Sequence, residues 1–187
     1  MKRLWVSGYR SYELGIFSPK DKKITVIKYA LKKNFKRLLE EEKLDWIIAG
    51  PNLGVEQWAL ESALELKSKY PLRTAMMTPY LEFSNRWNEK NQAIFSQLKE
   101  KVDFFGSISN SSYQSPSQLR NFQNFMINHT DSALLIYDLE HPGKTKFDYN
   151  LIKKYQEEKD YPLTLVDFYD LQEEAEEYAE EQGSYFN

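Results

Sequence analysis

Short apolar segments alternate with longer stretches in which apolar residues recur every three or four positions. Residues 24–39 show the second pattern and place Ile24, Ile27 and Leu31 on one face of a helix. The short apolar segments end at Gly, Pro or polar residues, as strands do. The pattern predicts strands at residues 4–7, 46–49, 73–79, 102–105, 133–137 and 162–166. It predicts helices at residues 24–39, 55–70, 85–101, 117–129 and 147–158, and an acidic helix at about 170–182.

This alternation of strands and helices is typical of βαβ units with right-handed crossovers. We therefore expect an α/β fold, a Rossmann-like three-layer sandwich with a mostly parallel central sheet. Residues 133–137 are the most apolar strand and are expected at the centre of the sheet. In the helix at 117–129, Leu119, Phe122 and Met126 are expected to face inward. Residues 1–187 are predicted to form a single domain.

Glycine residues cluster after the predicted strands. The chain has only seven glycines in 187 residues, yet Gly50 and Gly54 lie within one connection. The helix that begins near Gly54 is expected to present free amides and the positive end of its dipole, which suit an anion. Gly8 and Gly143 follow two other strands. Because parallel strands end at one edge of the sheet, these loops are expected to converge on one ligand-binding rim.

The residues of this rim form the candidate site. Phosphate is expected at Gly8, Arg10, Gly54 and the loop 143–145, because Arg makes charge-assisted bonds to phosphate. Glu56 and Asn124 are expected to hold a sugar or base, since a carboxylate beside a phosphate would be repelled. The full candidate set is Gly8, Tyr9, Arg10, Glu13, Gly50, Gly54, Glu56, Pro79, Asn124, Tyr137, Asp138, Gly143 and Thr145.

Each candidate residue also has a purely structural explanation. Glu56 fits a helix N-terminus without any ligand, because the dipole favours an acid there. Glu13 and Arg10 fit solvated loops, and Asn124 fits a solvent-facing stripe with Ser117, Asn121 and Asn128. Both alternatives stay open for every one of these side chains.

Composition and charge narrow the range of functions. The net charge of −3 disfavours general binding to nucleic acid, which usually needs a basic face. The absence of cysteine excludes disulfides and thiolate chemistry. The two histidines, His129 and His141, lack the spacing of a metal pair, so no metal is expected. No segment has the length of a membrane span, so we expect a cytoplasmic protein without one.

Three motifs in order resemble the YpsA family of the SLOG superfamily. They are residues 8–10, residues 50–59 and residues 124–131 with the strand that ends at Tyr137 and Asp138. The resemblance covers roughly residues 2–166 and implies a pocket for a nucleotide or nucleotide-derived ligand. YpsA proteins of Gram-positive bacteria are linked to cell division, which implies a division protein as a partner. The superfamily also contains DprA and the LOG phosphoribohydrolases.

The chain departs from the LOG signature Pro-Gly-Gly-x-Gly-Thr-x-x-Glu, because residues 50–56 read Gly-Pro-Asn-Leu-Gly-Val-Glu. Asn128 stands where related proteins often have Asp, and residues 143–145 read Gly-Lys-Thr instead of Gly-Gly-Thr. We therefore expect a sensor that binds an ADP-ribose-like molecule, with no other cofactor. The alternative is LOG-like hydrolysis of a nucleoside monophosphate, with Glu56 as the catalytic residue. Binding of single-stranded DNA, as in DprA, fits less well.

Two charged helix faces suggest further contacts. Lys28, Lys32 and Lys36 form a row that is expected to be a solvated face. The acidic last helix is either a solubilising end or a surface that docks on a basic partner, such as the lysine row of another subunit. A homo-oligomer is therefore left open.

Overall fold

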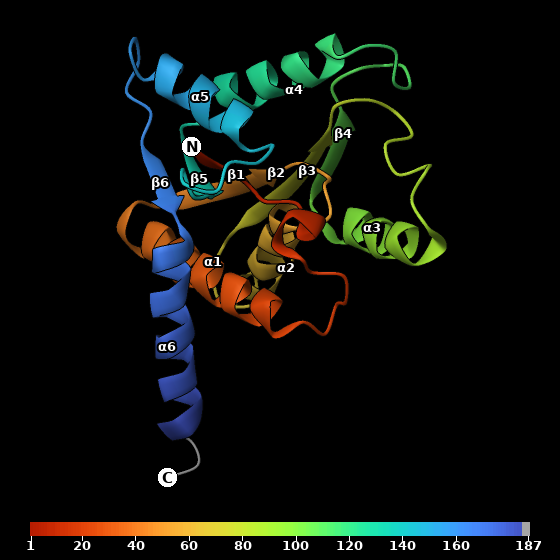
Figure 1. Cartoon of the computed structure of the whole chain (residues 1–187). Coiled ribbons are helices and arrows are strands. Elements are labelled where there is room, and N and C mark those ends of the chain that lie inside the picture. The colour runs from red at the N-terminus through yellow and green to blue at the C-terminus, as the bar shows by residue number, and fades with distance from the viewer. Residues whose placement is uncertain (185–187) are drawn as a thin grey trace.

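The computed structural model describes residues 1–184, and it contains a six-stranded, all-parallel sheet (Figure 1). The strands are β1 (Lys2–Gly8), β2 (Leu44–Ala49), β3 (Arg73–Thr78), β4 (Phe104–Ser107), β5 (Ser132–Ile136) and β6 (Leu163–Val166). Their order in the sheet is β4-β3-β2-β1-β5-β6. From β1 to β4 each new strand is added toward one edge, whereas β5 and β6 are added on the other side of β1, so the topological switch point lies between β1 and β5. This confirms the predicted Rossmann-like α/β fold.

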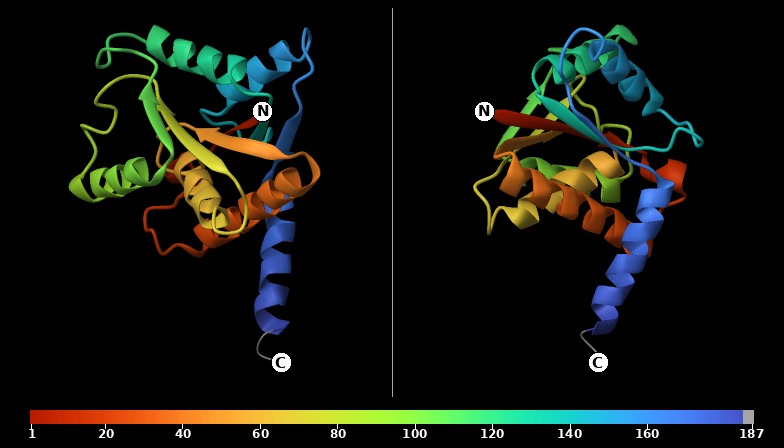
Figure 2. Two further views of the ribbon diagram at one scale, coloured as in Figure 1. Left: turned by 180° about the vertical axis from the view of Figure 1, so that it is seen from behind. Right: turned by 90° about the vertical axis from the view of Figure 1, so that its left-hand side faces the viewer.

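Helices cover both faces of the sheet. They are η1 (Ser11–Leu14), α1 (Lys22–Glu41), α2 (Val55–Leu66), α3 (Glu89–Lys101), α4 (Ser117–Asn128), α5 (Lys146–Tyr155) and α6 (Phe168–Ser184). The views agree that α1, α2 and α3 lie on one face and α4 and α5 on the other (Figures 1 and 2). This three-layer arrangement leaves the edge where the strands end open to the loops that carry the candidate residues.

The core explains why these segments form their elements. Ile27, Leu31 and Phe35 on α1 are buried, as their helical spacing predicts. All four residues from Ala133 to Ile136 in β5 are buried, as expected for a strand covered on both faces. β5 pairs with both β1 and β6, one position away from the centre, which β2 and β1 occupy. The prediction of a central position for β5 was therefore off by one strand.

Three other boundaries and positions differ from the sequence predictions. β4 begins at Phe104 because Val102 caps the end of α3, so Gly106 lies inside the strand and not in the loop after it. α3 begins at Glu89 because the Asn88 side chain accepts a hydrogen bond from the Asn91 amide. Leu119, expected to face inward, is 44% exposed, and its neighbour Gln118 is buried instead.

The acidic helix α6 packs against α1 of the same chain. Lys33 forms ion pairs with Glu174 at 3.1 Å and Glu177 at 2.6 Å, and the Tyr29 and Tyr178 rings meet with centroids 5.4 Å apart. The helix therefore docks on a basic surface, but on Lys33 and within one chain. In the predicted lysine row, Lys28 and Lys32 pair with glutamates of α2, so describing them as a solvated face was wrong.

No helix formed within residues 1–184 combines the length and the apolar character needed to cross a membrane.

Candidate functional site

Gly8, at the end of β1, and the loops that carry Gly54 and Gly143 meet at the switch point of the sheet between β1 and β5. A side chain at Gly8 would contact Val55 at the start of α2. One at Gly54 would contact the backbone of residues 9–11, and one at Gly143 would overlap Glu13. The loops after β1, β2 and β5 are therefore in direct contact, at the kind of position where open α/β sheets bind ligands.

Gly54 serves the packing of two loops. Its φ of +132° is accessible only to glycine, and a Cβ would lie 2.5 Å from the Tyr9 carbonyl oxygen. The Val55 amide donates to this oxygen at 3.1 Å, and the Ser11 amide donates to Leu53 at 3.0 Å. The β1 loop therefore covers the first turn of α2. The Val55 amide of that turn is not free to bind a ligand, because it donates to the Tyr9 carbonyl.

Glu56 is a buried carboxylate beside this junction. It is 4% exposed, and its oxygens accept hydrogen bonds from the Asn52 amide at 3.1 Å and the Asn52 side chain at 3.2 Å. Arg10 Nη1 lies 3.5 Å from Glu56 Oε1. Burial raises the pKa of Glu56, although Arg10 and Asn52 oppose the rise. A side chain at Gly50 would overlap this carboxylate, which explains why a glycine stands there.

Asp148, on the first turn of α5, is a second buried carboxylate that the sequence analysis missed. It is 8% exposed, and it accepts hydrogen bonds from Ser7 Oγ at 2.6 Å and Gln123 Nε2 at 2.7 Å. Burial raises its pKa, whereas Ser7, Gln123 and Arg10 lower it. The charge of Asp148 also raises the pKa of Glu56. Glu56 is thus the carboxylate that pairs with Arg10 at 3.5 Å, and the charge of Asp148 acts on the same group from further away.

Two signals in the sequence point to Asp148. Ser7 is a polar residue directly after the apolar residues 4–6 of β1, and a buried hydroxyl needs a partner. Asp148 follows Thr145 by three positions at the start of a helix, a spacing that places Thr145 at the N-cap and Asp148 on the first turn. Only the packing of α4 over α5 adds Gln123, which is the amide that reaches the site.

Glu13 connects the β1 and β5 loops. Its Oε1 accepts from the Arg10 amide at 2.8 Å, and its Oε2 accepts from the Lys144 amide at 3.1 Å. Gly143 leaves room for this carboxylate. Glu13 therefore fixes the two loops relative to each other.

Tyr9, Tyr137 and Asp138 form the base of the β5 loop. Tyr9 is buried, and its hydroxyl donates to the His141 carbonyl at 2.7 Å and accepts from the Asp138 amide at 2.9 Å. Burial raises the pKa of Tyr9 to about 12. The amides of Glu140 and Phe168 lower the pKa of Asp138, which caps the turn and the start of α6. These side chains hold the loop in place.

Thr145, Pro79 and Asn124 occupy three different surroundings. Thr145 precedes α5 and is fully buried, and within residues 1–184 its Oγ1 has no hydrogen-bond partner. Pro79 is buried at the end of β3, two strands from β1. Asn124 is exposed on α4, and the neighbouring Gln123 faces the site instead. Thr145 therefore lies on the β5 side of the rim. Asn124 does not face the site, and Pro79 lies two strands away from β1.

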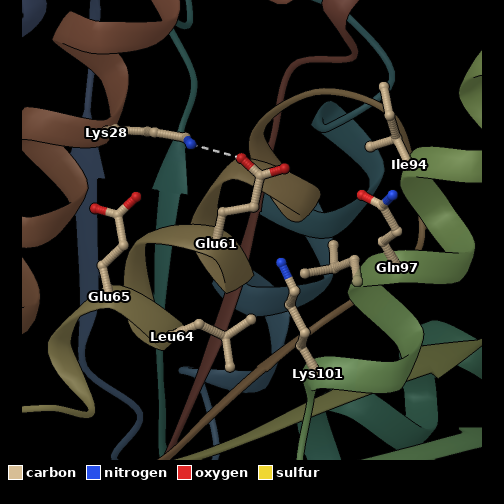
Figure 3. A pocket seen from close by; sticks show the side chains of 8 residues that line it. Lys28, Glu61, Leu64, Glu65, Ile94, Gln97 and Lys101 are labelled. Carbon is tan, nitrogen blue, oxygen red and sulfur yellow. Dashed lines mark ion pairs between the residues drawn. The ribbon is translucent and has the colours of Figure 1, made fainter.

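Two hollows flank α2 on the face covered by α1 and α3. One of about 340 Å³ is lined by residues of all three helices, and the ion pair between Lys28 and Glu61, 2.6 Å long, crosses its wall (Figure 3). The other, of about 310 Å³, extends from the same ion pair to Gly54. The backbone bridge between Arg10 and Gly54 lies at this end. Both hollows lie between α2 and its neighbours α1 and α3. The two carboxylates instead bond to Asn52 of the β2 loop and to Gln123 of α4.

Residues 1–184 include no group of three or more His, Asp or Glu side chains placed to hold a metal ion.

Comparison with known proteins gives consistent matches over the chain. The YpsA family model, described as the YspA SLOG family, matches residues 4–171. A UPF0398 protein of Lactobacillus helveticus (strain DPC 4571) is 65% identical over 188 residues, which cover 100% of both chains. One of Lactobacillus gasseri is 66% identical over 96% of this chain and 95% of its own. One of Limosilactobacillus reuteri (strain DSM 20016) is 54% identical over 97% of each.

Proposed function

The chain belongs to the YpsA family of SLOG proteins, and from this premise we propose that it binds a nucleotide or nucleotide-derived anion at the rim around Arg10. Membership of this family suggests a nucleotide-related binding fold. The proposed ligand is an ADP-ribose-like molecule, and the proposed role is that of a cytoplasmic sensor. Its output would be a change in the binding of a protein partner, such as a cell-division protein.

The observation that carries this proposal is a pair of buried carboxylates, of which Glu56 pairs with Arg10 and Asp148 is influenced by the charge of Arg10. Burying Glu56 and Asp148 costs free energy, since both pKa values are raised by burial. Stability alone does not require such a cluster, and perturbed carboxyl groups concentrate at functional sites. Their location at the reversal point of the sheet matches the usual ligand position of this architecture.

Each group has a chemical role in this proposal. Glu56 and Asp148 accept hydrogen bonds from ribose hydroxyls, which are donors that suit carboxylates. Arg10, whose side chain is 20% exposed, binds the phosphate. The unpartnered Thr145 hydroxyl is a further donor on the β5 side. An unsatisfied buried hydroxyl costs about 1–3 kcal/mol, so a ligand that bonds to it recovers part of that loss.

The binding proposal is tested by identifying small molecules that co-purify with the full chain under native conditions. Mass spectrometry is expected to find a nucleotide-derived molecule on the wild type and on Arg37→Ala, which removes an exposed arginine of α1. Arg10→Ala is expected to lose it. Equal recovery from all three proteins, or none from any, contradicts the proposed pocket.

Hydrolysis of an N-glycosidic bond is the second candidate, and the raised pKa of Glu56 favours it. A carboxylate with a raised pKa is a stronger base and can activate water beside a ribosyl group. In this case Glu56 is the catalytic residue. Release of ribose 5-phosphate from nucleoside monophosphates by the wild type, lost in Glu56→Gln, would establish this activity. Saturable binding without release would rule it out.

A further inference from the structure

A group of aromatic side chains lies at the carboxyl ends of β3 and β4. Tyr80 follows β3, and Tyr113 lies in the loop between β4 and α4, with ring centroids 5.3 Å apart and planes at 61°. The series continues from Tyr80 through Phe83 and Trp87 to Phe95, at centroid distances of 5.0, 5.8 and 5.5 Å. Phe95 is 6% exposed, whereas Tyr113 is 53% exposed. The series therefore runs from the core to an open ring at the surface.

The loop that carries Tyr113 is held firmly. The Leu81 amide donates to the Ser111 carbonyl at 2.9 Å, which joins the loop after β3 to the loop that carries Tyr113. The buried Gln118 accepts from the amides of Gln114 at 2.6 Å and Ser115 at 3.1 Å, and it donates to the Ser112 carbonyl at 3.0 Å. Because the loop is already ordered, a ligand would meet Tyr113 without a large loss of conformational entropy.

Helix α4 connects this aromatic group to the carboxylates. Gln118 holds the Tyr113 loop, and Gln123 on the same helix bonds to Asp148. Five residues of α-helix span about 7.5 Å along the axis. Between them, Phe122 lies against Gly50, next to Glu56. The aromatic group and the carboxylates therefore lie along one edge of the sheet, the aromatic group after β3 and β4 and the carboxylates at β1, β2 and β5.

We propose that Tyr80 and Tyr113 form the surface on which the base of the bound ligand stacks. This inference rests on the proposed function, because it gives the aromatic end of the ligand a place on the sheet edge that also carries Arg10. Aromatic side chains stack with any base, since every base has a flat π face. Arg86 supplies a positive charge near Tyr80, which opposes the effect of burial on the pKa of that tyrosine. The expected ligand class is thus a phosphorylated riboside that carries a base.

Two probes with and without a base test this inference on the full-length protein. ADP-ribose and ribose 5-phosphate are titrated calorimetrically into the wild type, Tyr113→Ala, Tyr113→Phe and Phe104→Ala. Phe104 is a matched control, because it is 52% exposed but stands at the opposite end of β4. Tyr113→Ala is expected to bind ADP-ribose roughly tenfold to a hundredfold more weakly, with unchanged affinity for ribose 5-phosphate. Tyr113→Phe keeps the ring and is expected to retain most of the affinity.

The outcomes separate this inference from the proposed function. If ADP-ribose binds the wild type and Tyr113→Ala equally well, or if Tyr113→Ala weakens both probes alike, the stacking surface is refuted while the site at Arg10 stands. If neither probe binds the wild type, the proposed function fails, and the stacking surface fails with it.

Discussion

Glu56 and Asp148 are buried where ionisation is costly, and individual neighbouring residues make room for these carboxylates or donate hydrogen bonds to them. Gly50 leaves space for the Glu56 carboxylate, and Ser7 replaces an apolar residue in β1 to donate to Asp148. Gly54 is required for a different reason, because its positive φ and the nearby Tyr9 carbonyl exclude any side chain. Glycines of the rim therefore act through packing, and their loss affects the fold before it affects a ligand.

Gly54→Ala is expected to destabilise the protein by about 1–3 kcal/mol from backbone strain alone. The free energy of unfolding in urea measures this effect. Gly183→Ala is a matched control, because a side chain there meets open space on α6 and alanine favours a helix. Equal stability of Gly54→Ala and wild type would show that the β1 loop does not cover α2 as described. A loss of ligand by Gly54→Ala alone is therefore not proof of contact.

Among the elements, the loops after β1 and β5 form one unit through Glu13. This side chain receives one amide from each loop, so the two loops position Arg10 and Thr145 jointly. The α6 helix adds to the same unit, because the Phe168 amide donates to Asp138 at 3.1 Å. The order of the loops around the candidate site thus depends on contacts between segments far apart in the sequence.

Glu13→Gln is expected to lower the free energy of unfolding by about 1–3 kcal/mol, because a charged acceptor of two amides is lost. Hydrogen exchange at the Lys144 amide is expected to become faster, since this amide donates to Glu13. Glu140→Gln changes an exposed acid of the same loop and serves as the control. Unchanged exchange at Lys144 in Glu13→Gln would refute the connection.

Element types could be predicted from the sequence because apolar periodicity is local. β4 was misplaced because Val102 is apolar but ends α3, and only pairing of Ala75 with Phe104 reveals where the strand begins. The convergence of Gly8, Gly54 and Gly143 followed from parallel strands ending at one edge. Asp148 could not be placed this way, because its partners come from β1 and α4 and meet it only in the packed fold.

For the whole molecule, the buried carboxylates make stability depend on pH. A folded-state pKa above the ordinary value means that the native protein holds the proton more tightly than the unfolded chain. The contribution of Asp148 is thus fully present below its ordinary pKa of 3.8 and is lost as the pH rises through the raised value. The same sign applies to Glu56.

Urea unfolding of the wild type and Asp148→Asn between pH 4 and pH 8 tests this sign. The wild type is expected to lose stability relative to Asp148→Asn as the pH rises. The loss amounts to about 1.4 kcal/mol for each unit by which the folded pKa exceeds the unfolded one. The quantity compared is the slope of unfolding free energy against pH. The substitution also changes the hydrogen bonds with Ser7 and Gln123, but that effect is the same at every pH and does not change the slope. A wild type that gains stability relative to the variant as the pH rises would show that burial does not raise the pKa of Asp148.

The central claim is that the rim around Arg10 binds a nucleotide-derived anion, and calorimetric titration of ADP-ribose into the wild type and Arg10→Ala tests it most directly. The expected result is saturable binding to the wild type and a loss of roughly tenfold or more in Arg10→Ala, because a charge-assisted bond to phosphate is removed. No saturable heat with the wild type, or the same affinity in both proteins, would contradict the claim.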